Sequence, residues 1–486
     1  KNVKMFNLKP IALVSGTVTC AVGFFLFIPL ITEIIYKTES WQSYAVPILL
    51  YLIVGGSLVI TNKNIDLKIS LKEAFIITVL SWLLLTFLCA VPFLYTEVNL
   101  SIVDALFESM SGVTTTGATT LSNLESLPKG ILIWRAFLQW LGGIGIVVIA
   151  LFILPFLRIG GMQLFHLEGD DPYDKSLPKI SSVIKKIFVI YAVLTAALVF
   201  LYYICGMKPF DAISHSFTTI STGGFSTYDS SFAFFNNDKI LLVAIIFMIL
   251  GSLPFLVLIQ TSKKNLLAIF KDHQVRVFIL ILFIAIVLIF YFANNFIDGN
   301  YLNKIITVSF NTISIISGTG YVSDNFENWG NYASVLFLIL MFIGGCAGST
   351  TGGLKIFRFQ ILFKYINLHF KKMLKPHSII ASRFNGRKIN ESTYESVMSF
   401  FFLYILTFFT SALLLSFSGL DFLTCISAAA STISNVGPGL GPIIGPDGNY
   451  GTLDSYSKII LIATMFLGRL ELLTILVLLL PSFWKD

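Results

Sequence analysis

Ten long apolar segments restrict the fold of this chain more than any other feature. They lie at about 11–35, 43–61, 72–96, 130–157, 184–206, 239–262, 275–297, 332–363, 394–418 and 456–481. A helix of roughly 20 apolar residues crosses about 30 Å of hydrocarbon. In lipid, only helices and closed barrels satisfy every backbone hydrogen bond, and barrel strands have only about ten residues. The segments therefore predict an all-α integral membrane protein with about ten transmembrane helices.

The overall composition agrees with this class. Of the 486 residues, 56% are hydrophobic and 12% are charged, whereas a soluble domain carries about 25% charged residues. The five cysteines show no paired spacing and mostly lie within apolar runs, so they predict neither a disulfide framework nor a metal site. The five histidines are scattered along the chain. Without a nucleophile, a metal cluster or an acid–base pair near one membrane face, the residues do not predict an enzyme.

The basic residues predict how the chain is oriented. If the N-terminus is cytoplasmic, the loops on the cytoplasmic side receive 25 of the 33 Lys and Arg residues, nine of them between Lys355 and Lys388. Basic residues gather on the cytoplasmic side of membrane proteins. Both termini are therefore predicted to be cytoplasmic, and the apolar run from Ile11 is interpreted as a retained first helix rather than a signal peptide. Topology explains the pI near 9.0, so the chain needs no nucleic acid partner, and membrane lipid is its expected surrounding.

Four of the outer loops contain a further apolar stretch that is too short to span a bilayer. These stretches follow the third, fifth, seventh and ninth long segments, and each ends in a turn rich in glycine and hydroxyl side chains. They read SIVDALFESMSGVTTTGAT (101–119), KPFDAISHSFTTISTGGFS (208–226), YLNKIITVSFNTISIISGTGY (301–321) and GLDFLTCISAAASTISNVGPG (419–439). Their last shared glycines, Gly117, Gly223, Gly320 and Gly437, are 106, 97 and 117 residues apart.

This near-constant spacing predicts an internal repeat. The unit consists of a long helix, a short re-entrant helix, a glycine turn and a second long helix, and four pseudo-symmetric units are predicted to surround one pore. Residues 1–70 would form two extra N-terminal transmembrane helices. The four repeats would occupy residues 71–160, 183–265, 274–365 and 390–486. Asp104, Asp211 and Asp421 lie near the starts of three short helices, where a carboxylate can cap free N–H groups.

The four turns have the composition of a cation filter. Irregular backbone at membrane depth occurs only where it is buried in protein or lines a water-filled path. A ring of backbone carbonyls can replace the hydration shell of a monovalent cation, and glycine allows the backbone angles that aligned carbonyls need. No ring of Asp or Glu accompanies the turns, whereas a divalent cation generally requires several carboxylates. The turns therefore predict a pore for a monovalent cation.

At these turns the sequence resembles the Trk/Ktr/HKT superfamily of potassium transporters. TTTGAT, STGGFS, SGTGY and SNVGPG are similar to its four filter segments, and GGCAGSTTGGLKIFR (344–358) and LGRLELLT (467–474) are similar to its inner helices of repeats three and four. The two extra N-terminal helices fit the TrkH-type membrane subunit. The resemblance implies a potassium filter formed by Thr115, Thr116, Gly117, Ser221, Thr222, Gly223, Gly318, Thr319, Gly320, Asn435, Val436 and Gly437. Family members with Ser at the first filter glycine tend toward sodium, so Gly117 favours potassium.

The resemblance also implies a gate. The glycine-rich break in the third repeat's inner helix would form a loop beneath the filter, comprising Gly344, Gly345, Cys346, Ala347, Gly348, Ser349, Thr350, Thr351, Gly352 and Gly353. Lys355 would lie at the cytoplasmic mouth of the pore, and Arg469 at the pore wall below the filter. From the residues alone, two alternatives remain open: a kinked helix packing through small residues at 344–353, and an Arg469 side chain bonded to carbonyls between helices. Gly251 and Pro254 predict a plain kink in the inner helix of the second repeat. Glu471 is predicted to be a structural partner for a helix end or a loop.

These features together predict a potassium uptake subunit that conducts K⁺ as a channel does, down its electrochemical gradient. The alternative is a secondary transporter that couples K⁺ to H⁺ or Na⁺. The chain is expected to carry no cofactor, with K⁺ as the transported ion. The resemblance further implies a bacterial cell (inner) membrane, a homodimer, and cytosolic TrkA-like nucleotide-binding regulatory subunits.

Overall fold

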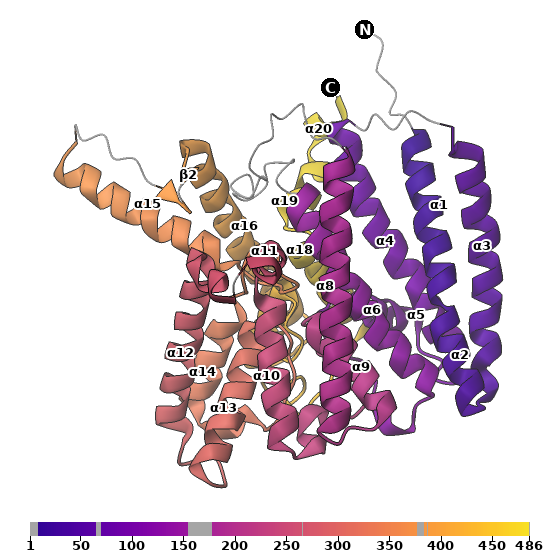
Figure 1. Cartoon of the computed structure of the whole chain (residues 1–486), viewed down its shortest axis with the longest axis horizontal. Coiled ribbons are helices and arrows are strands. Elements are labelled where there is room, and N and C mark those ends of the chain that lie inside the picture. The colour runs from indigo at the N-terminus through magenta and orange to yellow at the C-terminus, as the bar shows by residue number, and fades with distance from the viewer. Residues whose placement is uncertain are drawn as a thin grey trace.

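The computed structural model describes residues 8–64, 70–153, 177–264, 266–376, 383–385 and 387–485. Its regular structure is helical except for one antiparallel pair of two-residue strands, β1 (Arg383–Phe384) and β2 (Arg387–Lys388). The parallel membrane-length helices form one bundle (Figure 1). This arrangement confirms the prediction of an all-α membrane protein.

The predicted apolar segments contain helices, most of them long. They are α1 (Leu8–Phe25), α2 (Phe27–Tyr36), α3 (Gln42–Asn62), α4 (Leu71–Tyr95), α6 (Lys129–Val148), α8 (Leu177–Ile204), α10 (Asp238–Ser252), α11 (Phe255–Lys264), α12 (His273–Ala293), α14 (Asn331–Met341), α15 (Ile356–Leu374), α16 (Glu391–Ser416), α18 (Ser455–Arg469), α19 (Leu473–Leu476) and α20 (Pro481–Lys485). Within the described residues, seven helical stretches are long and apolar enough to span a membrane, or nine if each of two bent pairs is one span. The remaining predicted segment, 332–363, is divided by a loop between α14 and α15.

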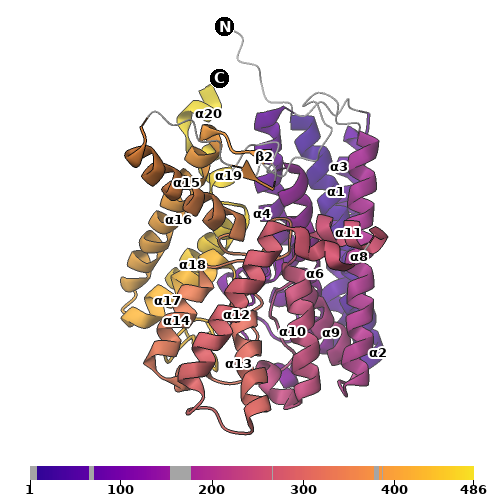
Figure 2. The same cartoon turned by 60° about the vertical axis from the view of Figure 1, so that its left-hand side comes forward.

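Four short helices lie where the re-entrant stretches were predicted. They are α5 (Ile102–Val113), α9 (Pro209–Ile220), α13 (Tyr301–Ile316) and α17 (Phe422–Ser434). Each inner helix packs against the short helix of the next repeat: α6 on α9, α10 on α13, α14 on α17, and α18 back on α5. The four repeats therefore form a closed ring in chain order. Figure 2 shows the bundle from a second side.

Two inner helices turn sharply where the sequence predicted continuous or merely kinked spans. The helix axis bends by 103° between α10 and α11. It bends by the same angle between α18 and the segment that begins with α19. In the first pair, Leu253 takes an extended conformation before Pro254, as the residue preceding a proline generally does. In the second, Glu471 and Leu472 have φ of 60° and 23°. The predicted plain kink at Gly251 and Pro254 is therefore wrong, and Arg469 ends a helix rather than lying in mid-span.

The two N-terminal helices attach to the first repeat through a buried carboxylate. Glu33 on α2 is fully buried, and its Oε1 accepts a hydrogen bond of 2.5 Å from the backbone N–H of Gly130. Gly130 lies in the first turn of α6, where unpaired N–H groups and the helix dipole favour a negative charge. Glu33 thus fixes α2 against the first repeat.

Of the three predicted capping carboxylates, only Asp421 caps its helix directly, accepting a hydrogen bond from the N–H of Thr424 at 3.0 Å. Ser101 caps α5 instead. The Asp211 carboxylate accepts hydrogen bonds from Thr227 and Tyr228 in the loop that follows its turn. A carboxylate in the first helical turn therefore serves as a loop anchor as readily as a cap.

Candidate ion pathway

The four turns share one backbone conformation. In each turn, a residue at or directly after the C-cap of the short helix has φ between 52° and 71°, and the residue two positions later has φ between 75° and 109°. The first set comprises Thr115, Thr222, Gly318 and Asn435, and the second comprises Gly117, Gly224, Gly320 and Gly437. Positive φ is uncommon for residues other than glycine. Its recurrence at matching places shows that the repeats are equivalent in structure.

The second turn is displaced by one residue from its predicted alignment. Gly224, with φ of 85°, occupies the place equivalent to Gly117, and Thr222 occupies the place equivalent to Thr115. Gly223, which the sequence pattern aligned with Gly117, is equivalent to Thr116. Ser221 is the C-cap residue of α9, before the turn itself. Sequence reasoning therefore missed Gly224, because STGGF contains two adjacent glycines and either could be aligned.

Each turn is anchored to its own short helix by the same backbone hydrogen bond. The N–H of the turn's second residue donates to a carbonyl five residues earlier at 2.8–2.9 Å. The pairs are Thr116 to Ser111, Gly223 to Thr218, Thr319 to Ser314, and Val436 to Ser431. All four accepting residues carry a hydroxyl side chain. The turns are thus held in one geometry around the ring.

Neighbouring turns touch through a glycine and a carbonyl. A Cβ atom placed on Gly117 would lie under 3.0 Å from the carbonyl oxygen of Gly223, a separation that real Cβ atoms essentially never show. The other three contacts of this kind join Gly224 to Thr319 O, Gly320 to Val436 O, and Gly437 to Thr116 O. The contacts pass from repeat one through repeat four and return to repeat one. Four carbonyl oxygens therefore surround one axis, and the absence of a side chain lets the backbones approach.

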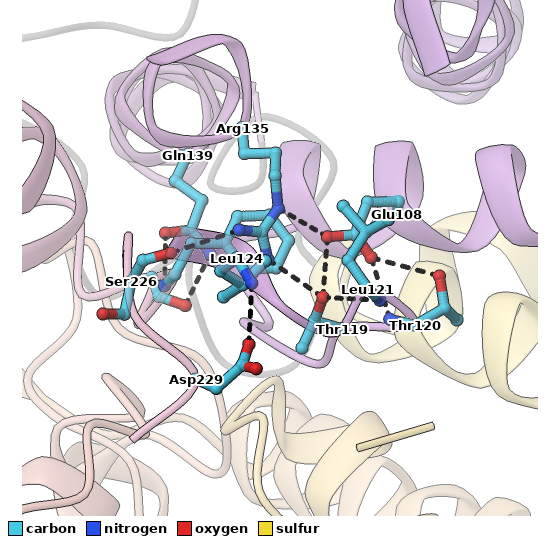
Figure 3. A network of polar contacts seen from close by, with 11 residues as sticks. Glu108, Thr119, Thr120, Leu121, Leu124, Arg135, Gln139, Ser226 and Asp229 are labelled. Atoms are coloured by element: carbon cyan, nitrogen blue, oxygen red, sulfur yellow. Dashed lines mark hydrogen bonds and ion pairs between the residues drawn. The ribbon is translucent and has the colours of Figure 1, made fainter. Parts of the chain in front are cut away.

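A buried ion pair supports the first and second turns from the outside (Figure 3). Arg135 on α6 contacts Glu108 on α5 at 2.6 Å between Nε and Oε1. Arg135 also donates to the carbonyl of Ser226 at 3.2 Å and to the hydroxyl of Thr119 at 2.9 Å. The other Glu108 oxygen accepts from the N–H of Thr120 at 3.0 Å. A buried charge is tolerated only when it is paired and hydrogen-bonded in this way.

The second turn has a further support in Gln139, also drawn in Figure 3. Its side-chain amide donates to the carbonyl of Gly223 at 2.6 Å and accepts from the N–H of Phe225 at 3.0 Å. Sequence reasoning did not single out Glu108, Arg135 or Gln139. The available signal was a charged or amide side chain inside a predicted membrane segment, which is costly unless it has partners.

The third and fourth turns are supported by comparable contacts. Asn311 on α13 binds both the hydroxyl and the N–H of Ser323. Tyr450 donates from its hydroxyl to the carbonyl of Gly437 at 2.8 Å. Each turn is therefore fixed by at least one buried polar side chain beyond the turn.

A cavity of about 150 Å³ lies directly outside the turns. All four repeats contribute to its lining, including the turn glycines Gly117, Gly224, Gly320 and Gly437. The charged side chains of Arg135, Asp229 and Asp447 also line it. The cavity therefore lies against the ring and is lined by all four repeats.

On the other side of the ring, the segment between α14 and α15 is a loop. Its residues 342–355 form no helix, and one parallel bridge joins Ile343 to Leu354. The N–H of Thr350 donates to the carbonyl of Gly251 at 3.2 Å, and its hydroxyl lies 3.1 Å from the hydroxyl of Thr222 in the second turn. The kinked-helix alternative for 344–353 is therefore wrong.

The loop makes further contacts with the second repeat, with the rest of its own repeat and with the fourth repeat. The N–H of Cys346 donates to the carbonyl of Ser252 at 3.1 Å, and the N–H of Ala347 donates to the side chain of Gln274 at 3.0 Å. A Cβ on Gly352 would collide with the carbonyl of Ser434 at the end of α17. The loop thus fits against the broken second inner helix and the fourth short helix, directly beneath the turns.

Other loop residues hold its own shape. Gly344 donates to the carbonyl of Leu354, Gly345 to the hydroxyl of Thr351, and the carbonyl of Gly348 accepts from Phe255. The hydroxyl of Ser349 donates to the carbonyl of Cys346 at 2.6 Å. Gly348 and Gly353 have positive φ. The ammonium group of Lys355 folds back onto the carbonyl and hydroxyl of Thr351.

Arg469 lies at the end of α18 and is only 3% exposed. Among the residues that the structure describes, none of its three guanidinium nitrogens has a hydrogen-bond partner. The alternative in which carbonyls between helices bind Arg469 is therefore not what the structure contains. The preceding Gly468 packs against the carbonyl of Ile433 in α17, so the charge lies near the fourth turn.

Glu471, two residues beyond Arg469, does not pair with it. Its carboxylate forms a buried ion pair with the guanidinium of Arg358 in the first turn of α15. Arg358 also lies 3.7 Å above the ring of Phe400 on α16. This pair joins the end of the loop to the break in the fourth inner helix, and Arg358 is a residue that sequence reasoning missed.

Comparison with known proteins places this architecture in a family. The sequence profile of the TrkH family, described as cation transport protein, matches residues 42–485. The chain is 37% identical to the Trk system potassium uptake protein TrkI of Halomonas elongata, covering 98% of this chain and 97% of that protein. It is also 37% identical to the Trk system potassium uptake protein TrkH of Escherichia coli K12, covering 95% and 96%.

A solved structure agrees with the sequence comparison. The crystal structure of the potassium transporter TrkH from Vibrio parahaemolyticus superposes with a TM-score of 0.91 at 32% identity, covering 99% of this chain and all of that one. The relatives are transport proteins rather than enzymes. This chain belongs to the TrkH family of cation transport proteins.

Proposed function

We propose that this chain takes up potassium by conducting it through the ring of four turns. The observation that carries the proposal is the closed series of glycine–carbonyl contacts from Gly117 around to Gly437. It places four backbone oxygens of equivalent turns about one axis, beneath the cavity to which all four repeats contribute. Carbonyl rings of this kind can replace the hydration shell of K⁺. The relatives from Halomonas elongata and Escherichia coli are named as potassium uptake proteins, which supports potassium as the ion.

The filter geometry is rigid because each turn has several independent supports. The shared backbone hydrogen bonds, the Arg135–Glu108 pair and Gln139 together resist movement of a carbonyl. Such preorganisation matters because an ion gives up its water only where the replacing oxygens are already in place. The carbonyls proposed to face the ion are those of Thr115, Thr116, Thr222, Gly223, Gly318, Thr319, Asn435 and Val436.

The filter proposal is tested with Gly117→Ser. A Cβ at this place would displace the Gly223 carbonyl, and a side chain is strained at φ of 85°. We expect Gly117→Ser to lower potassium over sodium selectivity, measured as uptake in cells that lack their own potassium uptake systems. Gly56→Ser is the matched control, because a Cβ on Gly56 would meet nothing within 4 Å. Unchanged selectivity in Gly117→Ser at normal protein levels would exclude the ring as the filter.

We further propose that the loop 344–353 is the gate, with Lys355 and Arg469 beside it. The loop contacts the second turn and the fourth short helix, so an ion leaving the ring would meet it. The buried guanidinium of Arg469, which has no hydrogen-bond partner within the described residues, would repel a cation and shorten its stay below the filter. Displacement of the loop would therefore open the pathway.

Coupled transport is the second candidate, and an electrical measurement separates the two. Coupled carriers usually place ionisable groups near the middle of the membrane, and the buried Lys355, Arg358, Arg469 and Glu471 lie near one another in this structure. Because Arg358 and Glu471 already form an ion pair, we favour a channel. The reversal potential of the purified protein in liposomes is then expected to follow the K⁺ gradient alone. A reversal potential that shifts with the pH gradient or the Na⁺ gradient would favour coupling.

The assembly and orientation are proposed from the same resemblance. The start of α1 and the short helix α20 lie at one end of the molecule (Figure 1), and we propose that this end faces the cytoplasm of a bacterial inner membrane. We also propose a homodimer that binds TrkA-like nucleotide-binding subunits at this end. Native mass spectrometry of the detergent-solubilised protein, alone and with such a subunit, would measure both stoichiometries.

A further inference from the structure

The fourth turn differs from the other three in the side chain at its first position. Asn435 stands where the other turns have Thr115, Thr222 and Gly318. The residue is only 1% exposed, and its amide nitrogen Nδ2 donates two hydrogen bonds. One, of 3.0 Å, goes to the hydroxyl of Thr116 in the first turn, and the other, also of 3.0 Å, goes to the carbonyl of Met465 on α18.

The side-chain amide of Asn435 has a single chemically sensible orientation. The Met465 carbonyl can only accept a hydrogen bond, so the atom that faces it is Nδ2 rather than Oδ1. Oδ1 is then buried, and within the described part of the chain it has no hydrogen-bond partner. A buried acceptor without a partner costs free energy. The side chain therefore keeps this position for the two bonds that Nδ2 donates.

The bond to Thr116 begins a directed chain of hydrogen bonds in the first repeat. The Thr114 hydroxyl donates to the carbonyl of Met110 on α5 at 2.7 Å. Because a hydroxyl has one hydrogen, the Thr116 hydroxyl, 2.7 Å from that of Thr114, donates to it in turn. Thr116 then accepts from Asn435, and every bond in the chain points the same way. Such chains strengthen their members, so the amide holds the Thr116 side chain in place.

The same bond crosses the place where the ring closes. A Cβ on Gly437 would lie 2.7 Å from the carbonyl oxygen of Thr116, and the corresponding separations at the other three turn glycines are shorter. The backbones are thus farthest apart between the fourth and first turns. Among the residues of the four turns, all of which the structure describes, the bond from Asn435 to Thr116 is also the sole hydrogen bond between side chains of two turns. The junction with the least backbone contact is the one that a side chain spans.

We propose that Asn435 is a positioning residue whose side chain sets the ion selectivity of the pore by fixing Thr116 where the ring closes. This inference rests on the proposed function, because it assigns a role within the same ring. Selectivity in a carbonyl ring depends on the size of the site and on the number and field of its dipoles. Without the amide, Thr116 loses the donor that holds its side chain, and its carbonyl oxygen is free to shift. The ring then adapts to Na⁺ as well as to K⁺, and discrimination falls.

The measurement is the K⁺-to-Na⁺ permeability ratio of the full chain in liposomes, taken from the reversal potential with K⁺ on one side and Na⁺ on the other. This ratio does not depend on how many pores are open, so it is insensitive to the packing of Asn435 beside Gly352 in the loop. Asn435→Gly removes the amide and leaves a residue that tolerates φ of 54°. We expect the ratio to fall by about fivefold or more.

Thr116→Val removes the same bond from the other side and is expected to lower the ratio equally. The double variant should lie within about twofold of either single variant, because one bond is lost in all three. Thr116→Ser keeps the hydroxyl and should recover most of the ratio that Thr116→Val loses. Asn236→Gly is the matched control: Asn236 is exposed, has φ of 41° and lies outside the turns, so its ratio should equal that of the parent.

An unchanged ratio in Asn435→Gly or in Thr116→Val would overturn the inference. So would a double variant in which the two losses multiply, or an equal fall in Asn236→Gly. If Asn435→Gly does not reach the membrane, Thr116→Val and Thr116→Ser carry the test. Gly117→Ser distinguishes this inference from the proposed function. A lowered ratio in Gly117→Ser with unchanged ratios in the other variants removes only the role of Asn435, whereas an unchanged ratio in Gly117→Ser overturns the filter and this inference with it.

Discussion

At the scale of single residues, the ring couples each repeat to the next. At each of the four turn glycines, the carbonyl oxygen of a neighbouring turn lies where a Cβ atom would be. A substitution there strains its own backbone and also displaces an oxygen in the neighbouring turn. The consequences of one methyl group thus reach two of the four oxygens that surround the axis.

Gly224→Ala tests the alignment of the second turn. Its Cβ would overlap the carbonyl of Thr319, and its φ of 85° is strained for alanine, at a cost of about 1–3 kcal/mol for the backbone alone. We expect potassium uptake to fall by about tenfold or more. Uptake by whole cells, normalised to protein in the membrane, is the measurement, with Gly56→Ala as the control. Normal uptake by Gly224→Ala would indicate instead that Gly223 is the residue equivalent to Gly117 in the second turn.

The sequence could predict most turn positions but not this one. Gly117 and Gly320 each follow a threonine and Gly437 follows a valine, so none of the three has a second glycine directly beside it. STGGF permits two alignments, and only backbone angles distinguish them. Glu108 and Arg135 lie 27 residues apart, on helices whose relative rotation the sequence does not give. Their pairing therefore could not be predicted, although each charge lies in an apolar run.

At the scale of elements, breaks in helices determine what lies beneath the ring. The interruptions at Gly251–Pro254, at 342–355 and at Glu471–Leu472 adjoin one another through the loop and the Arg358–Glu471 pair. Glycine composition predicted the second break. It did not predict the 103° turns, because the apolar pattern continues through Pro254 and Glu471, and the turns depend on contacts with the loop.

Thr350→Val tests the loop as a gate. Valine has nearly the same shape, but it lacks the hydroxyl that contacts Gly251 O at 3.0 Å and Thr222 at 3.1 Å. Loss of these bonds is expected to weaken the closed position by about 1–2 kcal/mol. The open-to-closed ratio in single-channel recordings should rise roughly 5- to 30-fold. Thr17→Val is the control, because the Thr17 hydroxyl bonds to a carbonyl in its own exposed helix turn, and its open-to-closed ratio should equal that of the parent. A lower open-to-closed ratio in Thr350→Val would contradict a blocking role for the loop.

At the scale of the whole molecule, the ring depends on contact between its last and first repeats. The ammonium group of Lys458 on α18 lies 2.6 Å from the Asp104 carboxylate on α5 and 2.9 Å from the carbonyl of Gly451. α18 and α5 also pack against each other. The repeat spacing predicted four units around one pore. It did not predict which units are in contact, because an internal repeat shows that the units have similar structures but not which of them are neighbours.

Lys458→Met tests this closure. Removing the ammonium group leaves Asp104 without its partner in a partly buried place, and the free energy of unfolding is expected to fall by about 1–3 kcal/mol, between the values for exposed and buried pairs. Unfolding in mixed detergent measures it, with Lys239→Met, an exposed lysine at the start of α10, as the control. Adding Asp104→Asn to Lys458→Met should restore part of the loss. Equal stability of Lys458→Met and the parent would show that packing alone closes the ring.

The same closure has a consequence for biosynthesis. Lys458 and Asp104 are 354 residues apart, and the glycine of the fourth turn rests on the carbonyl of Thr116 in the first. A nascent chain therefore cannot complete the ring until nearly all of it has left the ribosome. A polypeptide that ends early, at a premature stop codon or a stalled ribosome, carries up to three turns with no fourth to close them. Such a fragment cannot close the ring of turns, and we expect it to be less stable than the full chain and to be degraded.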